Sequence, residues 1–114
     1  MEARREHAWA ITSEKVEFAI RTIVGLVQPV KVILFGSYVS GNVTINSDLD
    51  ILVIVNDAVE DPRKESIRIR RALRGVSMPM DILVVPQEKW EELKDRPGMI
   101  YREALRNGKV VYES

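Results

Sequence analysis

The chain has 114 residues, of which 46% are hydrophobic and 30% are charged, a composition typical of one globular, soluble domain. Lysine and arginine together number 17, as do aspartate and glutamate, and the net charge of +0 argues against a general nucleic-acid or membrane-surface binder. The absence of cysteine excludes disulfides, thiolate zinc sites and a cysteine nucleophile, and it fits a cytoplasmic protein.

The predicted elements begin after an N-terminal extension, residues 1–12, which has charged residues but no apolar segment of the kind found in a secretory signal. The first helix is expected over 13–27, with Ser13 as its N-cap and Pro29 just beyond its end. Two strands are expected next, over 31–36 and 49–55. The second is apolar almost throughout, which predicts burial on both of its faces.

The second half of the chain predicts a similar alternation. Asp61 and Pro62 form a good helix start, and that helix is expected to end near Arg74. Gly108 is expected to close the last helix as a C′ residue. The other elements are a strand over 80–85, short helices over 86–94 and 99–107, and an edge strand over 109–113. This order predicts one α/β (α+β) domain over 1–114, a small mixed β-sheet flanked by helices.

Two aspartates, Asp48 and Asp50, stand at the start of the buried strand 49–55. Residues i and i+2 of a strand point the same way, about 6.5 Å apart. Two carboxylates held beside a buried strand repel each other, and a cation between them removes that cost. Oxygen ligands without nearby histidine or cysteine favour Mg²⁺ or Mn²⁺. The alternative is structural: Asp48 caps a turn and Asp50 pairs with a surface arginine. The EF-hand pattern is excluded, since no third acidic ligand, turn glycine or closing glutamate follows.

Two further features bear on these aspartates. Asp81 opens the next strand in "PMDILVV", which repeats the "DILV" that follows Leu49, so neighbouring strands would bring a third carboxylate to the same site. Gly36 and Ser37 end the strand 31–36, where glycine allows close approach of a phosphate and the following amides start a helical turn. Taken alone, Asp81 is better explained as a capped strand end after Pro79, and the glycine–serine pair as an ordinary strand-to-helix turn.

Together these residues resemble a known signature. Gly36–Ser37, ten intervening residues and then an Asp-Leu-Asp triplet are similar to the motif of the polymerase-β-type nucleotidyltransferases, and the short chain resembles the minimal nucleotidyltransferases (MNT). The resemblance covers roughly residues 16–112 and implies a polymerase-β-like nucleotidyltransferase fold. Many members have a basic residue after the glycine–serine pair, whereas this chain has Tyr38 and Ser40 there.

The resemblance also implies roles for single residues. Two Mg²⁺ or Mn²⁺ ions would be held on the triphosphate of a nucleotide, with ATP the expected one, and Asp81 would also help to activate the acceptor hydroxyl. The implied metal ligands and catalytic residues are Asp48, Asp50 and Asp81. The implied nucleotide-binding residues are Gly36 and Ser37, on the β- and γ-phosphates, and Ser47, which would support the loop presenting Asp48.

The resemblance implies a partner as well. Minimal members often accompany a small helical HEPN toxin, and the nucleotidyltransferase then acts as the antitoxin by transferring AMP to a tyrosine of that toxin. Two alternatives stay open from the sequence. The protein could neutralise its partner by binding alone, without catalysis, or it could modify a small molecule.

Two other segments have competing interpretations. Residues 63–74 carry Arg63, Lys64, Arg68, Arg70, Arg71 and Arg74, which predicts a solvated helix face or a patch facing phosphate or an acidic partner. Trp90 and Ile100 are expected to cap the core, and the alternative is an exposed partner-binding surface that they form with Met99 and Tyr101.

Overall fold

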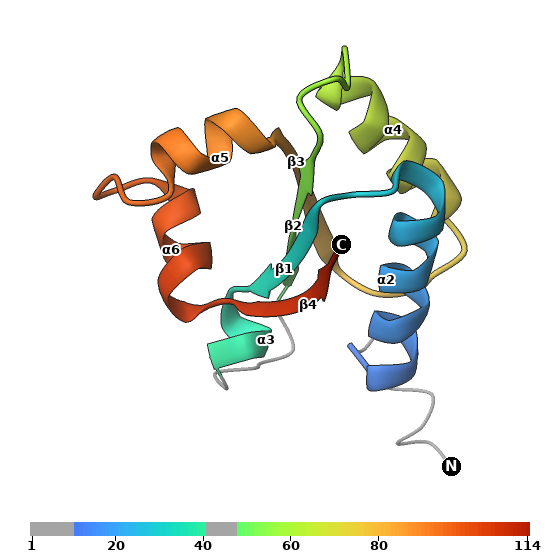
Figure 1. Cartoon of the computed structure of the whole chain (residues 1–114). Helices are drawn as coiled ribbons and strands as arrows, with labels where there is room; N and C mark the ends of the chain where they lie inside the picture. Colours follow the sequence, from blue (N-terminus) through green and yellow to red (C-terminus); the bar gives the residue numbers. More distant parts are fainter. Residues whose placement is uncertain (1–10, 41–47) are drawn as a thin grey trace.

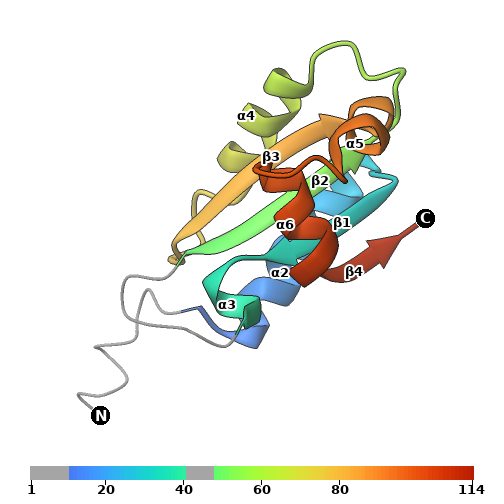
Figure 2. The same cartoon turned by 90° about the vertical axis from the view of Figure 1, so that its left-hand side faces the viewer.

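A mixed four-stranded sheet lies between two layers of helices in the computed structural model of the chain, which describes residues 11–40 and 48–114 (Figure 1). Helices α2 and α4 cover one face, and α5 and α6 cover the other (Figure 2). The strands are β1 (Lys31–Phe35), β2 (Leu49–Val55), β3 (Met80–Pro86) and β4 (Lys109–Glu113). The helices are α2 (Ser13–Val27), α3 (Ser37–Ser40), α4 (Pro62–Ala72), α5 (Gln87–Leu93) and α6 (Ile100–Asn107). The predicted fold class is confirmed.

The strand order β3-β2-β1-β4 makes β2 a central strand and β4 an edge strand, as predicted for this short segment. β1 pairs antiparallel with both β2 and β4, whereas β2 and β3 run parallel. Parallel neighbours need a crossover connection, because a tight turn cannot return the chain to the same end of the sheet. Helix α4 provides that crossover, so its position along β3 follows from the sheet topology.

Strand β2 is buried on both faces, which confirms the prediction from its apolar run. Ile51 and Val53 pack with α2 and α4 in one cluster, whereas Leu52 and Ile54 pack with Trp90 in a second cluster on the opposite face. Each of these four aliphatic side chains is at most 1% exposed. Burying a side chain of this kind contributes about 1.5–3 kcal/mol, so β2 is the most firmly held element of the sheet.

Helix α2 has the predicted length, but its cap is one residue earlier than expected. Thr12 is the N-cap and its side chain accepts a hydrogen bond from the Lys15 amide at 3.2 Å, whereas Ser13 is already the first helical residue. Serine and threonine are both good caps, so the local sequence does not separate them. The helix ends at Gln28, which takes the left-handed conformation (φ 49°) before Pro29.

Helix α4 begins as predicted and ends slightly early. Asp61 accepts hydrogen bonds from the amides of Arg63 and Lys64 at 3.1 and 3.3 Å, and Pro62 occupies the first turn. The helix stops at Ala72 rather than near Arg74. Its basic residues are all exposed, as a solvated helix face requires. None of the helices in the described ranges is long and apolar enough to cross a membrane.

Helices α5 and α6 close the second face. Asp57, just after β2, accepts a hydrogen bond from the Glu88 amide at 2.8 Å and so fixes the start of α5. Trp90 is 3% exposed and meets the Tyr101 ring edge-on, with centroids 6.5 Å apart. The prediction for Trp90 is therefore confirmed. The prediction for Ile100 is wrong: it is 44% exposed, because Tyr101 and Ala104 are the α6 residues that turn inward.

Gly108 ends α6, as predicted. Its φ of −83° is extended, since the chain enters β4 at once. Glycine is needed here for space. A Cβ at this position would collide with the Ala104 carbonyl oxygen and would lie 2.6 Å from Ile33 Cγ2.

Replacing Gly108→Ala is therefore expected to destabilise the protein by about 1–3 kcal/mol, the usual cost of overpacking. The free energy of unfolding in urea measures this effect. Gly25→Ala is the matched control, because a Cβ at this α2 position meets nothing within 4 Å. Alanine is the better helix former, so the control should gain up to about 1 kcal/mol. Equal stability of the two variants would contradict the packing argument.

Candidate active site

Three strand ends meet at one corner of the sheet. Because β1 runs antiparallel to β2, the end of β1 lies beside the starts of β2 and β3. In the register, Phe35 pairs with Asp50, and Asp50 pairs with Asp81. Paired residues point to the same face of a sheet, and neighbouring strands lie about 4.8 Å apart. The sequence prediction that Asp81 would join Asp50 on an adjacent strand is met by this register.

Asp48 and Asp81 differ from Asp50 in their surroundings. Asp48 lies just before β2 and is exposed, whereas Asp50 is partly buried within the strand. Asp81 is also exposed, on the face that carries α5 and α6, because its neighbour Ile82 packs into the core on the α2 and α4 side. The corner thus presents two solvent-facing carboxylates around one that is partly withdrawn from water.

Gly36 lies directly against Asp50. Its φ is +90°, a conformation that residues with a side chain rarely adopt. A Cβ on Gly36 would collide with Asp50 Oδ2 and would lie 3.1 Å from Asp50 Cγ. Glycine is therefore required here twice, by the backbone conformation and by the nearby carboxylate. Its predicted contact with phosphate stays a prediction.

The two serines predicted at the site are not placed by the structure. Ser37 begins the one-turn helix α3, but its side chain is outside the described part of the chain, and Ser47 lies wholly outside the described residues. Tyr38 packs partly buried against the core formed with α2 and α4. The turn after Gly36 thus keeps the predicted strand-to-helix form.

The position of Asp50 at the corner shifts the pKa of its carboxyl group. Burial raises the pKa of its carboxyl group above the ordinary range, and the negative charges of Asp81 and then Asp48 raise this pKa further. The two neighbours act on Asp50 through space, so all three carboxylates share one electrostatic environment. Perturbation of this kind is common at functional sites.

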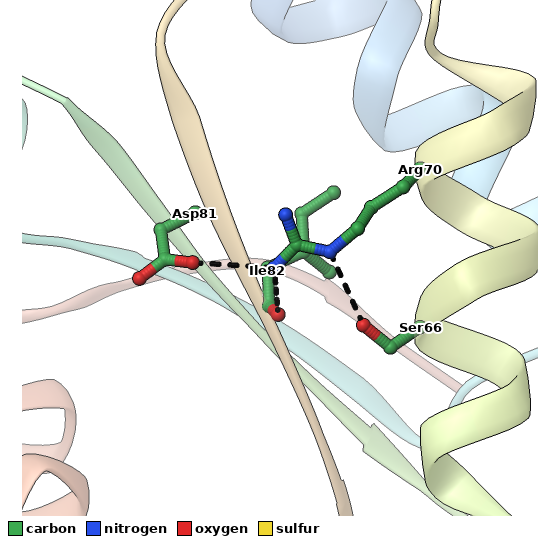
Figure 3. Close-up of polar contacts among 4 residues, drawn as sticks. All are labelled: Ser66, Arg70, Asp81 and Ile82. Atoms are coloured by element: carbon green, nitrogen blue, oxygen red, sulfur yellow. Dashed lines mark hydrogen bonds and ion pairs between the residues drawn. The ribbon is translucent and has the colours of Figure 1, made fainter.

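Arg70 is the residue at this corner that the sequence analysis missed. Its guanidinium Nη2 lies 3.3 Å from Asp81 Oδ1 and donates to the Ile82 carbonyl oxygen at 3.2 Å, while Nε donates to Ser66 Oγ at 3.4 Å (Figure 3). The side chain extends from α4 past the outer edge of β3. The sequence offers a surface arginine as the alternative partner of Asp50, whereas the structure places Arg70 beside Asp81. No local pattern marks Arg70 among the six basic residues of this segment.

The donor set at the corner suits a hard divalent cation. All three candidate ligands are carboxylates, and a cation would offset the repulsion that raises the Asp50 pKa. Within residues 11–40 and 48–114, however, no three acidic, histidine or cysteine side chains already lie close enough to hold one ion together. The backbone brings the aspartates to one corner, but the side chains are not yet gathered. Their role as metal ligands stays a prediction.

The comparisons with known proteins agree with this fold. The sequence model of the nucleotidyltransferase domain family matches residues 14–111, and the chain belongs to that family. No curated protein matches the chain at a significant level. The matched range includes Gly36, Ser37, Ser47 and all three aspartates of the predicted signature.

Solved structures show the same fold at low sequence identity. A mutant form of the toxin–antitoxin pair MntA–HpeT is 18% identical, with a TM-score of 0.54, covering 91% of this chain and 75% of that one. A toxin–antitoxin structure with AMP-PNP is 20% identical, with a TM-score of 0.53 and the same coverage. A candidate nucleotidyltransferase from Sulfolobus solfataricus is 19% identical, with a TM-score of 0.51, covering 90% of each chain.

The raised pKa of Asp50 predicts a pH-dependent effect on stability. The folded protein binds this proton more tightly than the unfolded chain does, so ionised Asp50 destabilises the fold above its ordinary pKa of about 3.9. Asp50→Asn should therefore raise the melting temperature at pH 7 in the presence of a chelator. This gain in melting temperature should shrink as the pH falls, first through the pKa of Asp50 in the folded protein and then through its pKa in the unfolded chain.

Glu92→Gln is the control for this measurement, because it removes one negative charge from an exposed position of α5. A gain at pH 7 that is equal for the two variants would reflect net charge alone. A loss of stability in Asp50→Asn at neutral pH would contradict the prediction.

The contact between Gly36 and Asp50 predicts a second effect. Gly36→Ala should lose more stability than Gly98→Ala in urea unfolding. Both glycines have a positive φ, of 90° and 80°, so both variants carry backbone strain of about 1–3 kcal/mol. A Cβ on Gly98 meets nothing within 4 Å, whereas a Cβ on Gly36 meets the Asp50 carboxylate. Equal losses of stability in the two variants would show that the Asp50 carboxylate can move aside at no cost in free energy.

Proposed function

We propose that this protein is a metal-dependent nucleotidyltransferase that transfers AMP from ATP to a tyrosine hydroxyl of a HEPN-type toxin, and so acts as an antitoxin in the cytoplasm. The observation that carries the proposal is the register of the sheet. It sets Asp50 beside Asp81 at the mouth of a buried strand, with Gly36 against the Asp50 carboxylate.

The class of reaction is supported by the family to which the chain belongs. The choice of ATP and of a toxin partner is supported more indirectly. Among the proteins of similar fold, one is a toxin–antitoxin pair, and another is a toxin–antitoxin bound to AMP-PNP, an ATP analogue. These are properties of those proteins, and for this chain they indicate which substrate and partner to test first.

Rigid placement is the contribution of the fold to this chemistry. Asp50 is fixed at the start of β2, whose following residues are buried on both faces. Asp81 lies beside it in the register. Two divalent ions held by Asp48, Asp50 and Asp81 would neutralise the triphosphate and lower the pKa of the acceptor hydroxyl. Phosphoryl transfer depends mainly on positioning and charge, so a small rigid corner is sufficient.

The proposed reaction is an in-line displacement at the α-phosphorus of ATP. The acceptor oxygen forms a bond to this phosphorus while the bond to the β-phosphate oxygen breaks, and pyrophosphate leaves. The hydroxyl proton passes to a base at the corner, where Asp81 is the nearest candidate on β3. The Asp81 side chain is 56% exposed, which leaves the corner accessible to a hydroxyl presented by another protein.

Asp50→Asn and Asp48→Asn are each expected to lower transfer by about 100-fold or more, because loss of a metal ligand removes several kcal/mol of charge stabilisation. The measurement is incorporation of labelled AMP into the toxin in the presence of Mg²⁺. Asp95→Asn, at an exposed position beyond α5, is the matched control and should keep full activity. Circular dichroism would verify that each variant is folded. Transfer by Asp50→Asn at the rate of the unmodified protein would exclude the catalytic proposal.

The same variants separate catalysis from neutralisation by binding. If the protein modifies its toxin, Asp50→Asn should fail to protect cells that express the toxin. Full protection by Asp50→Asn would instead favour a non-catalytic antitoxin that masks its partner. If small acceptors are labelled and the toxin is not, the small-molecule alternative is favoured.

A further inference from the structure

We propose that Arg70 is a positioning residue that holds Asp81 away from the cation site, so that a divalent ion must displace the guanidinium from this carboxylate before the site is complete. The inference rests on the proposed function, since it assumes that Asp81 serves as a metal ligand. It adds a residue from helix α4, outside the glycine–serine and aspartate motifs, to the control of the site.

The guanidinium is held in place by more than Asp81. Its Nη2 donates to the Ile82 carbonyl oxygen at 3.2 Å, on the outer edge of the sheet, and its Nε donates to Ser66 Oγ one turn earlier on α4 at 3.4 Å (Figure 3). These two contacts involve a backbone group and a neighbouring residue of the same helix. Arg70 therefore has partners at the edge of β3 that do not depend on Asp81.

The backbone and the side chain of Asp81 are directed to different places. The register with Asp50 brings its backbone to the corner. Its Oδ1, however, lies 3.3 Å from Arg70 Nη2, at the outer edge of β3. Among the described residues, no three carboxylates are gathered around one point. We attribute part of this spacing to the ion pair with Arg70, because it draws Asp81 Oδ1 toward the outer edge and away from a shared cation.

The ion pair is weak enough to be exchanged. The side chains of Arg70 and Asp81 are 50% and 56% exposed, and exposed pairs contribute little to stability. A divalent cation between carboxylates offers a stronger partner for Asp81 than a solvated guanidinium does. Because Arg70 keeps its contacts with Ile82 and Ser66, it can take Asp81 back when the ion leaves. The arrangement would lower the affinity for the ion without blocking it.

Direct titration with Mn²⁺, in the absence of nucleotide, tests the inference without requiring turnover. Arg70→Gln should bind Mn²⁺ about two- to five-fold more tightly than the unmodified protein, the range that an exposed ion pair allows. Arg71→Gln is the matched control. It removes the same charge from the next residue of α4, which is exposed and has no ion pair among the described residues. An increase in affinity that is larger for Arg70→Gln than for Arg71→Gln supports the proposal.

Equal affinities of Arg70→Gln and Arg71→Gln, or weaker binding by Arg70→Gln, would overturn it. If Arg70→Gln does not fold, Arg70→Lys replaces it, because lysine keeps the charge but lacks the planar fork that reaches Asp81 and Ile82 together. Tighter Mn²⁺ binding by Arg70→Lys supports the proposal, and unchanged binding overturns it.

Asp50→Asn in the same titration distinguishes this failure from failure of the proposed function. If Asp50→Asn binds Mn²⁺ as the unmodified protein does, the metal site itself is wrong, and the inference about Arg70 fails with it. If Asp50→Asn loses binding while the two arginine variants are alike, the site stands and only the role of Arg70 is rejected.

Discussion

The parallel pairing of β2 with β3 is the constraint on which the rest of the site depends. It brings Asp50 and Asp81 side by side, and it requires the crossover helix that carries Arg70. The pairing cannot slip by one residue, because a slip would turn the buried side chains of β2 toward the wrong face. Strand β2 packs against a separate hydrophobic cluster on each face, so a slip in either direction along the strand would disrupt both clusters. The register of an apolar strand thus determines the position of a polar site.

The charges at the corner lower the stability of the fold, and the proposed chemistry needs them. Asp50 is partly withdrawn from water and faces two other negative charges, with no cation among the described residues to balance them fully. Arg70 offsets some of this charge, but only at Asp81 and only at the outer edge of the sheet. A fold selected for stability alone would place a neutral residue at this position. The charge is tolerated because the remainder of β2 is so deeply packed, and the same packing keeps the carboxylate in place.

Much of this arrangement is local enough to be predicted from the sequence. Strand β2 has the predicted bounds, since a continuous apolar run between polar segments has few alternatives, and the repeated "DILV" marked Asp81 as a companion of Asp50. The failures involve contacts between distant segments. Arg70 meets Asp81 only because α4 lies along the sheet edge, and the need for space at Gly108 comes from Ile33, far away in the sequence, as well as from Ala104. The exposure of Ile100 depends in the same way on which residues of α6 face Trp90.

The bond from Arg70 to the Ile82 carbonyl has a consequence for the behaviour of the protein in concentrated solution. β3 ends the sheet on one side, and a strand in that position offers unpaired backbone groups to any other extended chain. A bulky, charged side chain fastened across this edge occupies one of those groups and hinders the approach of a second strand. The residue proposed to control the Asp81 carboxylate would therefore also hinder edge-to-edge pairing between two molecules.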